Sequence, residues 1–324
     1  MAMSNCRTDL ALESRELYRK NIDEKSEVPG VQVEEYDSDD ALITRVKIVS
    51  KEGETAMGKP CGSYITIEIP KLHSEYPERY EATCNLLCKE LAALMHLPKC
   101  TTALVIGLGN RYITADSLGP KTVEKLMTTR HLIEHIPDQL DECIRPVCAL
   151  APGVLGITGI ETGEIVRGVV ERVKPDLVVA VDALAARRID RINTTIQLSD
   201  TGISPGSGVG NRRQGLNKDT LGVPTIAIGV PTVVDALTIA NDTIDLVLGA
   251  LQSRPNTSDM FGDLDESSKS SLIENVLSPY IGDLTVTTKE VDSVMDRMSK
   301  ILAGGMNMAF HEGITLTEID SFLC

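Results

Sequence analysis

Two aspartates, Asp116 and Asp182, are the residues of this sequence best placed to do chemistry. Asp182 ends the apolar run 177–181, and Asp116 follows the apolar run 103–106 after a glycine-rich turn. Short apolar runs of this kind are typical of buried parallel strands, and ligands and catalytic groups collect at the carboxyl ends of such strands. Two carboxylates delivered there could share a proton and activate a water molecule for hydrolysis.

Each aspartate also has a simpler interpretation, as the N-cap of the helix that follows. The turn around Asp116 favours more than a cap, because Gly109 and Gly119 permit tight backbone paths and Asn110 tolerates a left-handed conformation. We therefore treat both aspartates as candidate catalytic residues. Asn110 and Thr114 are candidates for substrate binding or for support of this loop.

The elements that must position these residues alternate between strand and helix patterns, which predicts an α/β protein with a parallel sheet flanked by helices. Residues 1–40 are polar and charge-rich, and we expect them to be a mobile or peripheral segment. The expected strands are 41–49, 64–69, 103–106, 146–150, 177–181 and 224–230. The expected helices are 78–95, 118–130, 157–173, 183–192, 233–251 and 286–304.

These patterns divide the chain into three large parts. Residues 10–97 form an N-terminal extension with strands and one helix, and residues 98–251 form the α/β core. Residues 252–324 contain a Ser/Asp-rich linker or lid and then a C-terminal helical segment. Within the core, residues 194–222 form a long glycine-rich loop, and such loops in compact domains are usually functional or disordered.

We expect that loop to lie at the rim of the active site, where Arg212 and Arg213 could contact an anion or a substrate. A flexible surface excursion is the alternative interpretation.

The composition excludes several classes of function. The chain has 324 residues, a net charge of -15 and a pI of about 4.8. Direct binding to nucleic acid is not expected, because it needs a basic surface, although a basic protein substrate fits this charge. No run approaches the roughly 18 apolar residues of a membrane helix, and the start of the chain lacks the apolar region of a secretory signal.

Other familiar sites are also not expected. Residues 107–112 (GLGNRY) lack the third glycine of a dinucleotide-binding turn, and the sequence contains no phosphate-binding loop and no nucleophile elbow. Cys84 and Cys88 lie one helical turn apart, but no histidine cluster joins them. We therefore expect reduced thiols and no zinc site.

Four segments resemble the spore germination endopeptidase family, the proteases that degrade small acid-soluble spore proteins in spore-forming bacteria. The resemblance covers essentially the whole chain. The segments are RTDLA at residues 7–11, residues 107–120, VVAVDALAAR at residues 178–187 and IQLSDTGISPGSGVGN at residues 196–211. It implies a three-layer α/β fold of the phosphorylase/hydrolase-like kind, similar to that of the hydrogenase-maturation endopeptidases.

The resemblance matches Asp116 and Asp182 to the family's two essential aspartates. One ionised carboxylate would take a proton from water, and its protonated partner would polarise the scissile carbonyl or protonate the leaving amine. The maturation-type relatives bind a metal with an acidic pair and a histidine, but the matching region 226–232 has no histidine. We therefore predict catalysis without a metal or a cofactor, even if the enzyme is formally classified as a metalloendopeptidase.

The resemblance also implies an inactive zymogen that removes its own propeptide. The family cleaves substrates in sequences of the form Thr-Glu-(Phe/Ile)-Ala-Ser-Glu, after the first Glu, and residues 8–13 (TDLALE) nearly copy this sequence. We therefore predict self-cleavage between Asp9 and Leu10, with residues 1–9 as the propeptide and mild acid as the trigger. A frayed terminus is the alternative interpretation. The resemblance also implies that the protein is a homotetramer. It implies a location in the cytoplasm of the forespore and the spore core.

Two other functions are kept as alternatives. A metal-dependent maturation-type endopeptidase of the same fold would act on another protein and would not cleave itself. A non-catalytic binding protein would use Asp116 and Asp182 only as caps, and asparagine would then replace either of them without loss of function.

Overall fold

The computed structural model describes residues 8–22, 27–38, 41–72, 75–95, 98, 101–136, 144–204, 214–252 and 284–323. Within these residues the strands form one nine-stranded sheet with the order β1-β2-β3-β7-β8-β6-β4-β5, and β9 pairs with β8. Strands β5, β4, β6 and β8 are parallel, and the other neighbours are antiparallel. The strands are β1 Val31–Ser38, β2 Ala41–Ile48, β3 Gly62–Glu68, β4 Ala103–Gly107, β5 Val147–Leu150, β6 Leu177–Ala186, β7 Thr195–Ser199, β8 Thr225–Asp235 and β9 Thr285–Val286.

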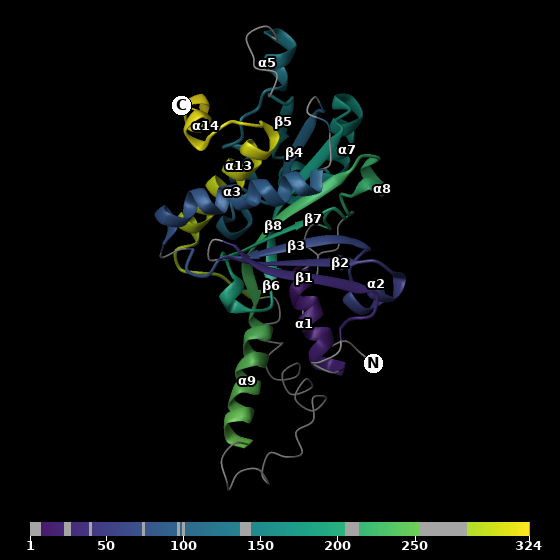
Figure 1. Ribbon diagram of the computed structural model, residues 1–324, viewed down its shortest axis with the longest axis vertical. Helices are drawn as coiled ribbons and strands as arrows, with labels where there is room; N and C mark the ends of the chain where they lie inside the picture. Colours follow the sequence, from purple (N-terminus) through teal and green to yellow (C-terminus); the bar gives the residue numbers. More distant parts are fainter. Residues whose placement is uncertain are drawn as a thin grey trace.

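Helices cover both faces of this sheet, which confirms the predicted α/β class. Helices α3 and α13 pack together on one face, and α7 covers the other (Figure 1). The helices are α1 Ala11–Ile22, α2 Lys51–Met57, α3 Tyr76–Met95, η1 Thr114–Asp116, α4 Leu118–Val123, α5 Arg130–His135, α6 Leu155–Thr158, α7 Thr162–Val173, η3 Ile189–Arg191, α8 Lys218–Leu221, α9 Ala236–Gln252, α13 Val291–Phe310 and α14 Leu316–Leu323. No described helix is both long enough and apolar enough to cross a membrane.

Strand β6 can lie in the interior of the sheet, between β8 and β4, because both of its faces are apolar. Val179 and Val181 pack into the core beneath α3 and α13, and Val178 and Ala180 pack against the face covered by α7. A strand that is buried on both sides reads as a continuous apolar run, as expected for the parallel part of a sheet.

The expected helix over residues 183–192 is wrong. Strand β6 continues to Ala186, where it still pairs with β8, and only the short 3₁₀ turn η3 follows. The reason is tertiary: Leu184 and Ala186 alternate onto the face that packs against Leu10, so the strand gains burial that a helix would lose. Asp182 is therefore inside a strand and not at its end.

Two segments expected to be irregular are ordered. Residues 195–199 of the glycine-rich loop form β7 between β3 and β8, because Ile196 and Leu198 alternate into the core. Near the N-terminus, residues 11–22 form α1 and residues 31–38 form β1, so this region is part of the sheet and its cover.

Other helix boundaries also differ from those expected. The single helix expected over 118–130 is α4, a turn segment and then α5. The helix expected over 157–173 is interrupted at Gly159, which has a left-handed conformation with φ of 69°. Near the C-terminus, α13 and α14 replace the single helix expected over 286–304. The described cysteines Cys61, Cys84, Cys88 and Cys148 are free thiols.

A buried histidine makes the fold sensitive to acid. His311 is 0% exposed, and its Nδ1 accepts the backbone N–H of Arg145 at 3.2 Å. Burial lowers the pKa of His311 to about 4 from its ordinary value of 6.5. The folded state therefore binds fewer protons than the unfolded state between these values, so stability is complete above pH 6.5 and is lost as the pH falls toward 4.

We expect His311 alone to lower the free energy of unfolding by about 2 kcal/mol between pH 7.5 and pH 5. Urea denaturation at both values would measure this loss. His311→Gln should flatten the dependence by that amount, whereas His131→Gln, on the exposed face of α5, should leave it unchanged. Equal pH dependence of wild type and His311→Gln would contradict the assignment.

Candidate active site

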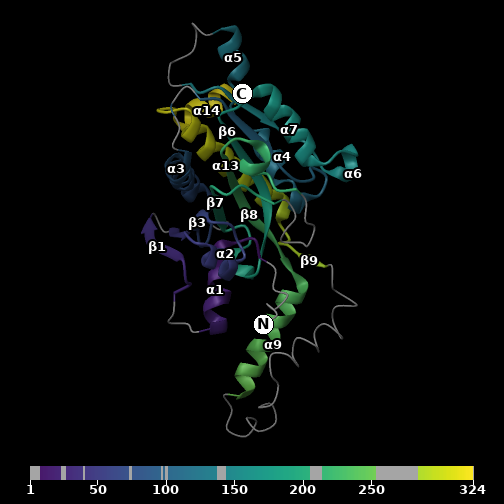
Figure 2. The same ribbon diagram turned by 90° about the vertical axis from the view of Figure 1, so that its right-hand side faces the viewer.

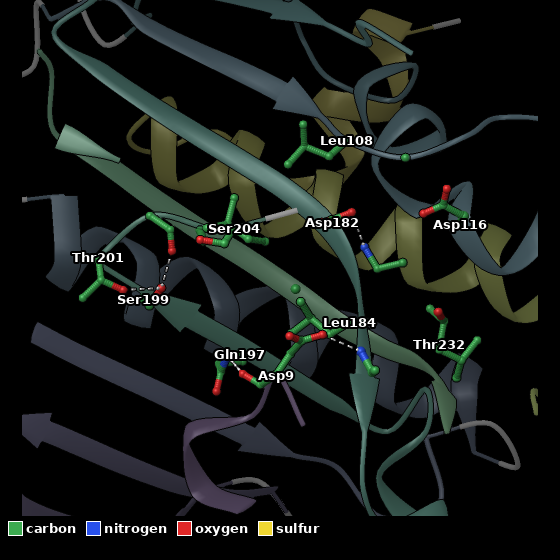
Figure 3. Close-up of a pocket in the computed structure, with 18 of the residues that line it drawn as sticks. Asp9, Leu108, Asp116, Asp182, Leu184, Gln197, Ser199, Thr201, Ser204 and Thr232 are labelled. Carbon is green, nitrogen blue, oxygen red and sulfur yellow. Dashed lines mark hydrogen bonds between the residues drawn. The ribbon is translucent and has the colours of Figure 1, made fainter. Parts of the chain in front are cut away.

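Asp116 and Asp182 line the same pocket, of about 490 Å³, which also receives Asp9. Figure 3 shows the three aspartates around this pocket, with Asp9 beside Gln197 and Leu184. The predicted convergence of Asp116 and Asp182 therefore agrees with the structure, although their catalytic role stays a prediction.

Asp182 is fixed by the register of the sheet. It lies opposite Gly229 of β8, and its side chain points to the same face as Leu184. The residue is 5% exposed, and its Oδ1 accepts the backbone N–H of Ala183 at 3.0 Å. A carboxylate on a rigid central strand is held more precisely in position than one on a loop.

Asp116 belongs to the 3₁₀ turn η1, which is tied to the strand ends. Its Oδ2 accepts the backbone N–H of Asn110 at 2.8 Å, and Thr232 of β8 donates its hydroxyl to the Ala115 carbonyl at 2.7 Å. Gly109 has φ of 109°, and a Cβ there would meet the backbone carbonyl of Asp116. The glycine therefore lets the turn close over the end of β4.

The other predicted site residues have different positions. Asn110 supports the turn, since its Oδ1 accepts the backbone N–H of Tyr112 at 3.0 Å. Thr114 donates its hydroxyl to Asp292 of α13 at 3.0 Å, so it ties η1 to that helix and does not line the pocket. Arg212 and Arg213 lie outside the described residues.

The predicted processing site, Asp9 and Leu10, is docked against β6. The backbone N–H of Asp9 donates to the Ala185 carbonyl at 3.0 Å, and the backbone N–H of Ala185 donates to Asp9 Oδ2 at 2.9 Å. Leu10 is 0% exposed and packs with Leu184 and Ala186. Asp9 and Leu10 therefore have fixed partners, whereas residues 1–7 of the predicted propeptide lie outside the described residues.

Two side chains that were not predicted from the sequence contact the same peptide. The Asp9 carbonyl accepts hydrogen bonds from Lys59 Nζ at 2.8 Å and from Gln197 Nε2 at 3.1 Å. Gln197 Oε1 accepts the backbone N–H of Ala11 at 2.7 Å. The strand pattern gave no specific signal, because Gln197 shares one face of β7 with the polar residues Thr195 and Ser199.

The docked segment is anchored further along by Glu13, which is 1% exposed. Its two carboxylate oxygens accept the backbone N–H groups of Arg187 and Arg188 at 2.7 and 2.9 Å. Arg191 approaches Glu13 at 3.4 Å and also pairs with Glu16 at 2.6 Å. A buried carboxylate needs such partners, because an unpaired one would cost several kcal/mol.

The described residues contain no group of three or more His, Cys, Asp or Glu side chains arranged to hold a metal ion. The absence of a histidine from residues 226–232 is a property of the sequence. Catalysis without a metal stays a prediction that chelation can test.

Comparison with known proteins gives the class of the chain. The model of a family described as germination protease matches residues 11–259 and 248–323. A germination protease of Clostridium tetani is 50% identical over 321 residues, covering 98% of this chain and 99% of the relative. Germination proteases of Caldanaerobacter subterraneus and Bacillus subtilis are 50% and 44% identical, and each alignment covers 98% of this chain and at least 96% of the relative.

The α/β fold and these matches define the chain as a peptidase, an enzyme that acts on protein substrates. More narrowly, it belongs to the germination protease family. The resemblance inferred from the sequence motifs is thereby confirmed.

Proposed function

We propose that this protein is the endopeptidase that initiates degradation of small acid-soluble, DNA-protecting spore proteins during germination, with Asp116 and Asp182 as a water-activating pair. The observation that carries the proposal is the convergence of both carboxylates on one pocket that also holds a peptide segment of the chain itself. Family membership supports the spore-germination setting.

The proposed chemistry needs two carboxylates in different protonation states. Two acids that share a site do not both ionise readily, so one stays protonated and the pair titrates as a unit. The ionised member takes a proton from water as the water attacks the scissile carbonyl carbon. The protonated member then supplies a proton to the leaving amine.

A purified small acid-soluble spore protein, incubated with the enzyme after an acid pulse, would test this function. We expect specific cleavage that continues when a chelator is present. Chelator-sensitive cleavage would favour the metal-dependent alternative, and absence of cleavage would contradict the proposed substrate.

The same pocket supports a proposal of self-processing, in which residues 1–9 are a propeptide. Asp9 and Leu10 are seated against β6 through both the backbone and the side chain of Asp9. We expect mild acidification to yield a product that begins at Leu10, because protonation relieves the repulsion between close carboxylates.

Mass spectrometry of the acidified protein would identify that product. The same protein held at pH 7 is the control, and a processing rate that does not change between pH 5 and pH 7 would count against the acid trigger. A product that begins at any other residue would exclude cleavage between Asp9 and Leu10.

The proposed location is the cytoplasm of the forespore and the spore core.

We also propose that the protein acts as a homotetramer. Helix α9 extends away from the body of the molecule in both views (Figures 1 and 2). It exposes Leu246 by 75% and Val247 by 52%. Exposed apolar side chains on a projecting helix support assembly with other copies.

A further inference from the structure

The Asp9 carbonyl oxygen has two side-chain donors that the aspartate pair does not account for. Lys59 Nζ and Gln197 Nε2 converge on this one oxygen at 2.8 and 3.1 Å. A carbonyl in a loop needs only one partner to be satisfied. Two donors on one carbonyl, one of them an ammonium group, match the geometry that stabilises negative charge developing on oxygen.

The sheet places this carbonyl on the same face as Asp182. Gln197 lies opposite Gly229 in the β7–β8 pair, and Asp182 lies opposite Gly229 in the β6–β8 pair. Gln197, Gly229 and Asp182 therefore form one row across the sheet. The Cα atoms of Gln197 and Asp182 lie roughly 10 Å apart. Their side chains point away from the core that contains Ile196, Ile228 and Val181.

Gly229 leaves room in this row for the side chain of Leu184. A Cβ on Gly229 would meet the side chain of Leu184, and Gly229 itself lines the pocket between the two polar residues. Leu184 therefore covers Gly229, and the pocket that Asp9, Asp182 and Gln197 line lies beside this side chain. A water molecule in that pocket could reach the Asp9 carbonyl carbon from the side of the aspartates.

Lys59 is held where it can supply positive charge to the same carbonyl. It follows Gly58, the left-handed C-cap of α2 with φ of 63°, which turns the chain toward the pocket. Burial of the ammonium lowers the pKa of Lys59, and the nearby charges of Asp9 and Glu13 oppose this effect. In a site with little water an ammonium interacts more strongly with a developing oxyanion than it would in solution.

We propose that Lys59 and Gln197 form the oxyanion-binding site for hydrolysis of the bond between Asp9 and Leu10. This inference rests on the proposed self-processing function. Water attacks the Asp9 carbonyl carbon, and the π-electron pair moves onto the carbonyl oxygen, which Lys59 and Gln197 stabilise. The ionised aspartate takes the water proton. When the C–N bond breaks, the protonated aspartate supplies a proton to the Leu10 nitrogen, which leaves an Asp9 carboxyl group and a Leu10 amine.

This assignment changes the roles of the residues in the pocket. If Lys59 and Gln197 polarise the carbonyl, the protonated member of the aspartate pair is needed only for the leaving amine. A different role for Lys59 and Gln197 would be purely structural, tying the segment to the pocket without helping the reaction. The two roles differ in what happens to docking when one donor is removed.

The test uses the full chain and follows the first-order rate of self-processing by mass spectrometry in wild type, Lys59→Met, Lys59→Arg and Gln197→Glu. Hydrogen exchange of the peptide that contains Ala185 reports docking, because that amide donates to Asp9. We expect Lys59→Met and Gln197→Glu each to lower the rate by about 100-fold, with the Ala185 amide still protected. Lys59→Arg keeps a charged donor and should recover part of the rate.

Lys51→Met is the matched control, since Lys51 lies on α2 but its side chain is 94% exposed. It should process at the wild-type rate. Wild-type rates in Lys59→Met and Gln197→Glu would overturn the oxyanion-site inference but not the proposed self-processing. A slower rate accompanied by loss of Ala185 protection would do the same. Failure of the wild type to cut between Asp9 and Leu10 would overturn both the inference and the proposed self-processing.

Discussion

Asparagine in place of Asp116 or Asp182 is expected to lower cleavage of a small acid-soluble spore protein by about 1,000-fold or more in a protein that stays folded. Asparagine keeps the shape of the side chain and its ability to accept hydrogen bonds, but it cannot exchange a proton with water. Both residues line the same pocket, so loss of either should disable the pair as a unit.

The measurement is kcat/KM for the wild type and the two variants after the acid pulse, with circular dichroism to confirm folding. Asp235→Asn is a matched control. Asp235 ends β8, and its Oδ1 accepts the backbone N–H groups of Leu237 and Thr238 at 2.7 and 3.2 Å. It is therefore a capping aspartate at the end of a strand. Asparagine at this position should change kcat/KM by less than about twofold.

Cleavage by both Asp116→Asn and Asp182→Asn at the control rate would end the two-aspartate mechanism. It would also favour the alternative in which these residues act only as caps. Loss of cleavage in one variant alone would mean that a single carboxylate serves as general base and that the second has a supporting role.

Gly119→Ala is expected to lower the free energy of unfolding by about 3 kcal/mol or more. A Cβ at this position would overlap the backbone N and O of Leu108 and would lie 2.6 Å from the Val181 carbonyl oxygen. All of these atoms belong to the backbone of central strands or their ends, so they cannot move away as a flexible side chain could. The contact is tight because α4 begins directly above the end of β4, where Gly107 pairs with Val181 of β6.

Urea denaturation of Gly119→Ala and of Gly168→Ala would measure this effect against a control. Gly168 lies inside α7, and a Cβ there would meet nothing within 4 Å. Alanine at position 168 should raise stability by about 0.5–1 kcal/mol, because it restricts the unfolded chain and favours the helix. Equal stability of Gly119→Ala and the wild type would mean that α4 can move away from the end of β4 and from Val181 of β6 without cost.

The pairing of Asp116 with Asp182 was predictable because it depends on local features. An apolar run identifies each strand, and the parallel pairing of β4 with β6 brings the turn after β4 close to the position of Asp182. The continuation of β6 to Ala186 was not predictable in the same way. It depends on contacts with β8 and with Leu10, which are distant in the sequence, and tertiary burial of this kind overrides local propensity.

The contribution of the N-terminal segment to the pocket was only partly predictable. The motif at residues 8–13 is the basis of the proposed cut, but it does not indicate what holds the segment in place. Lys59 and Gln197 are separated from Asp9 by 50 and 188 residues. A single lysine in a turn or a single glutamine in a strand carries no pattern that identifies such a contact, so only the sheet register brings them together.

The anchoring of Glu13 defines how short this chain can become at its N-terminus. The contacts of Leu10 with β6 and of Glu13 with the residues after β6 all lie on the C-terminal side of the bond between Asp9 and Leu10. A polypeptide that begins at Leu10 keeps every one of them. One that begins at Ser14 loses both, which uncovers apolar side chains and leaves Arg191 without one of its acidic partners. The boundary of the minimal folded enzyme therefore falls within a few residues of the proposed cut.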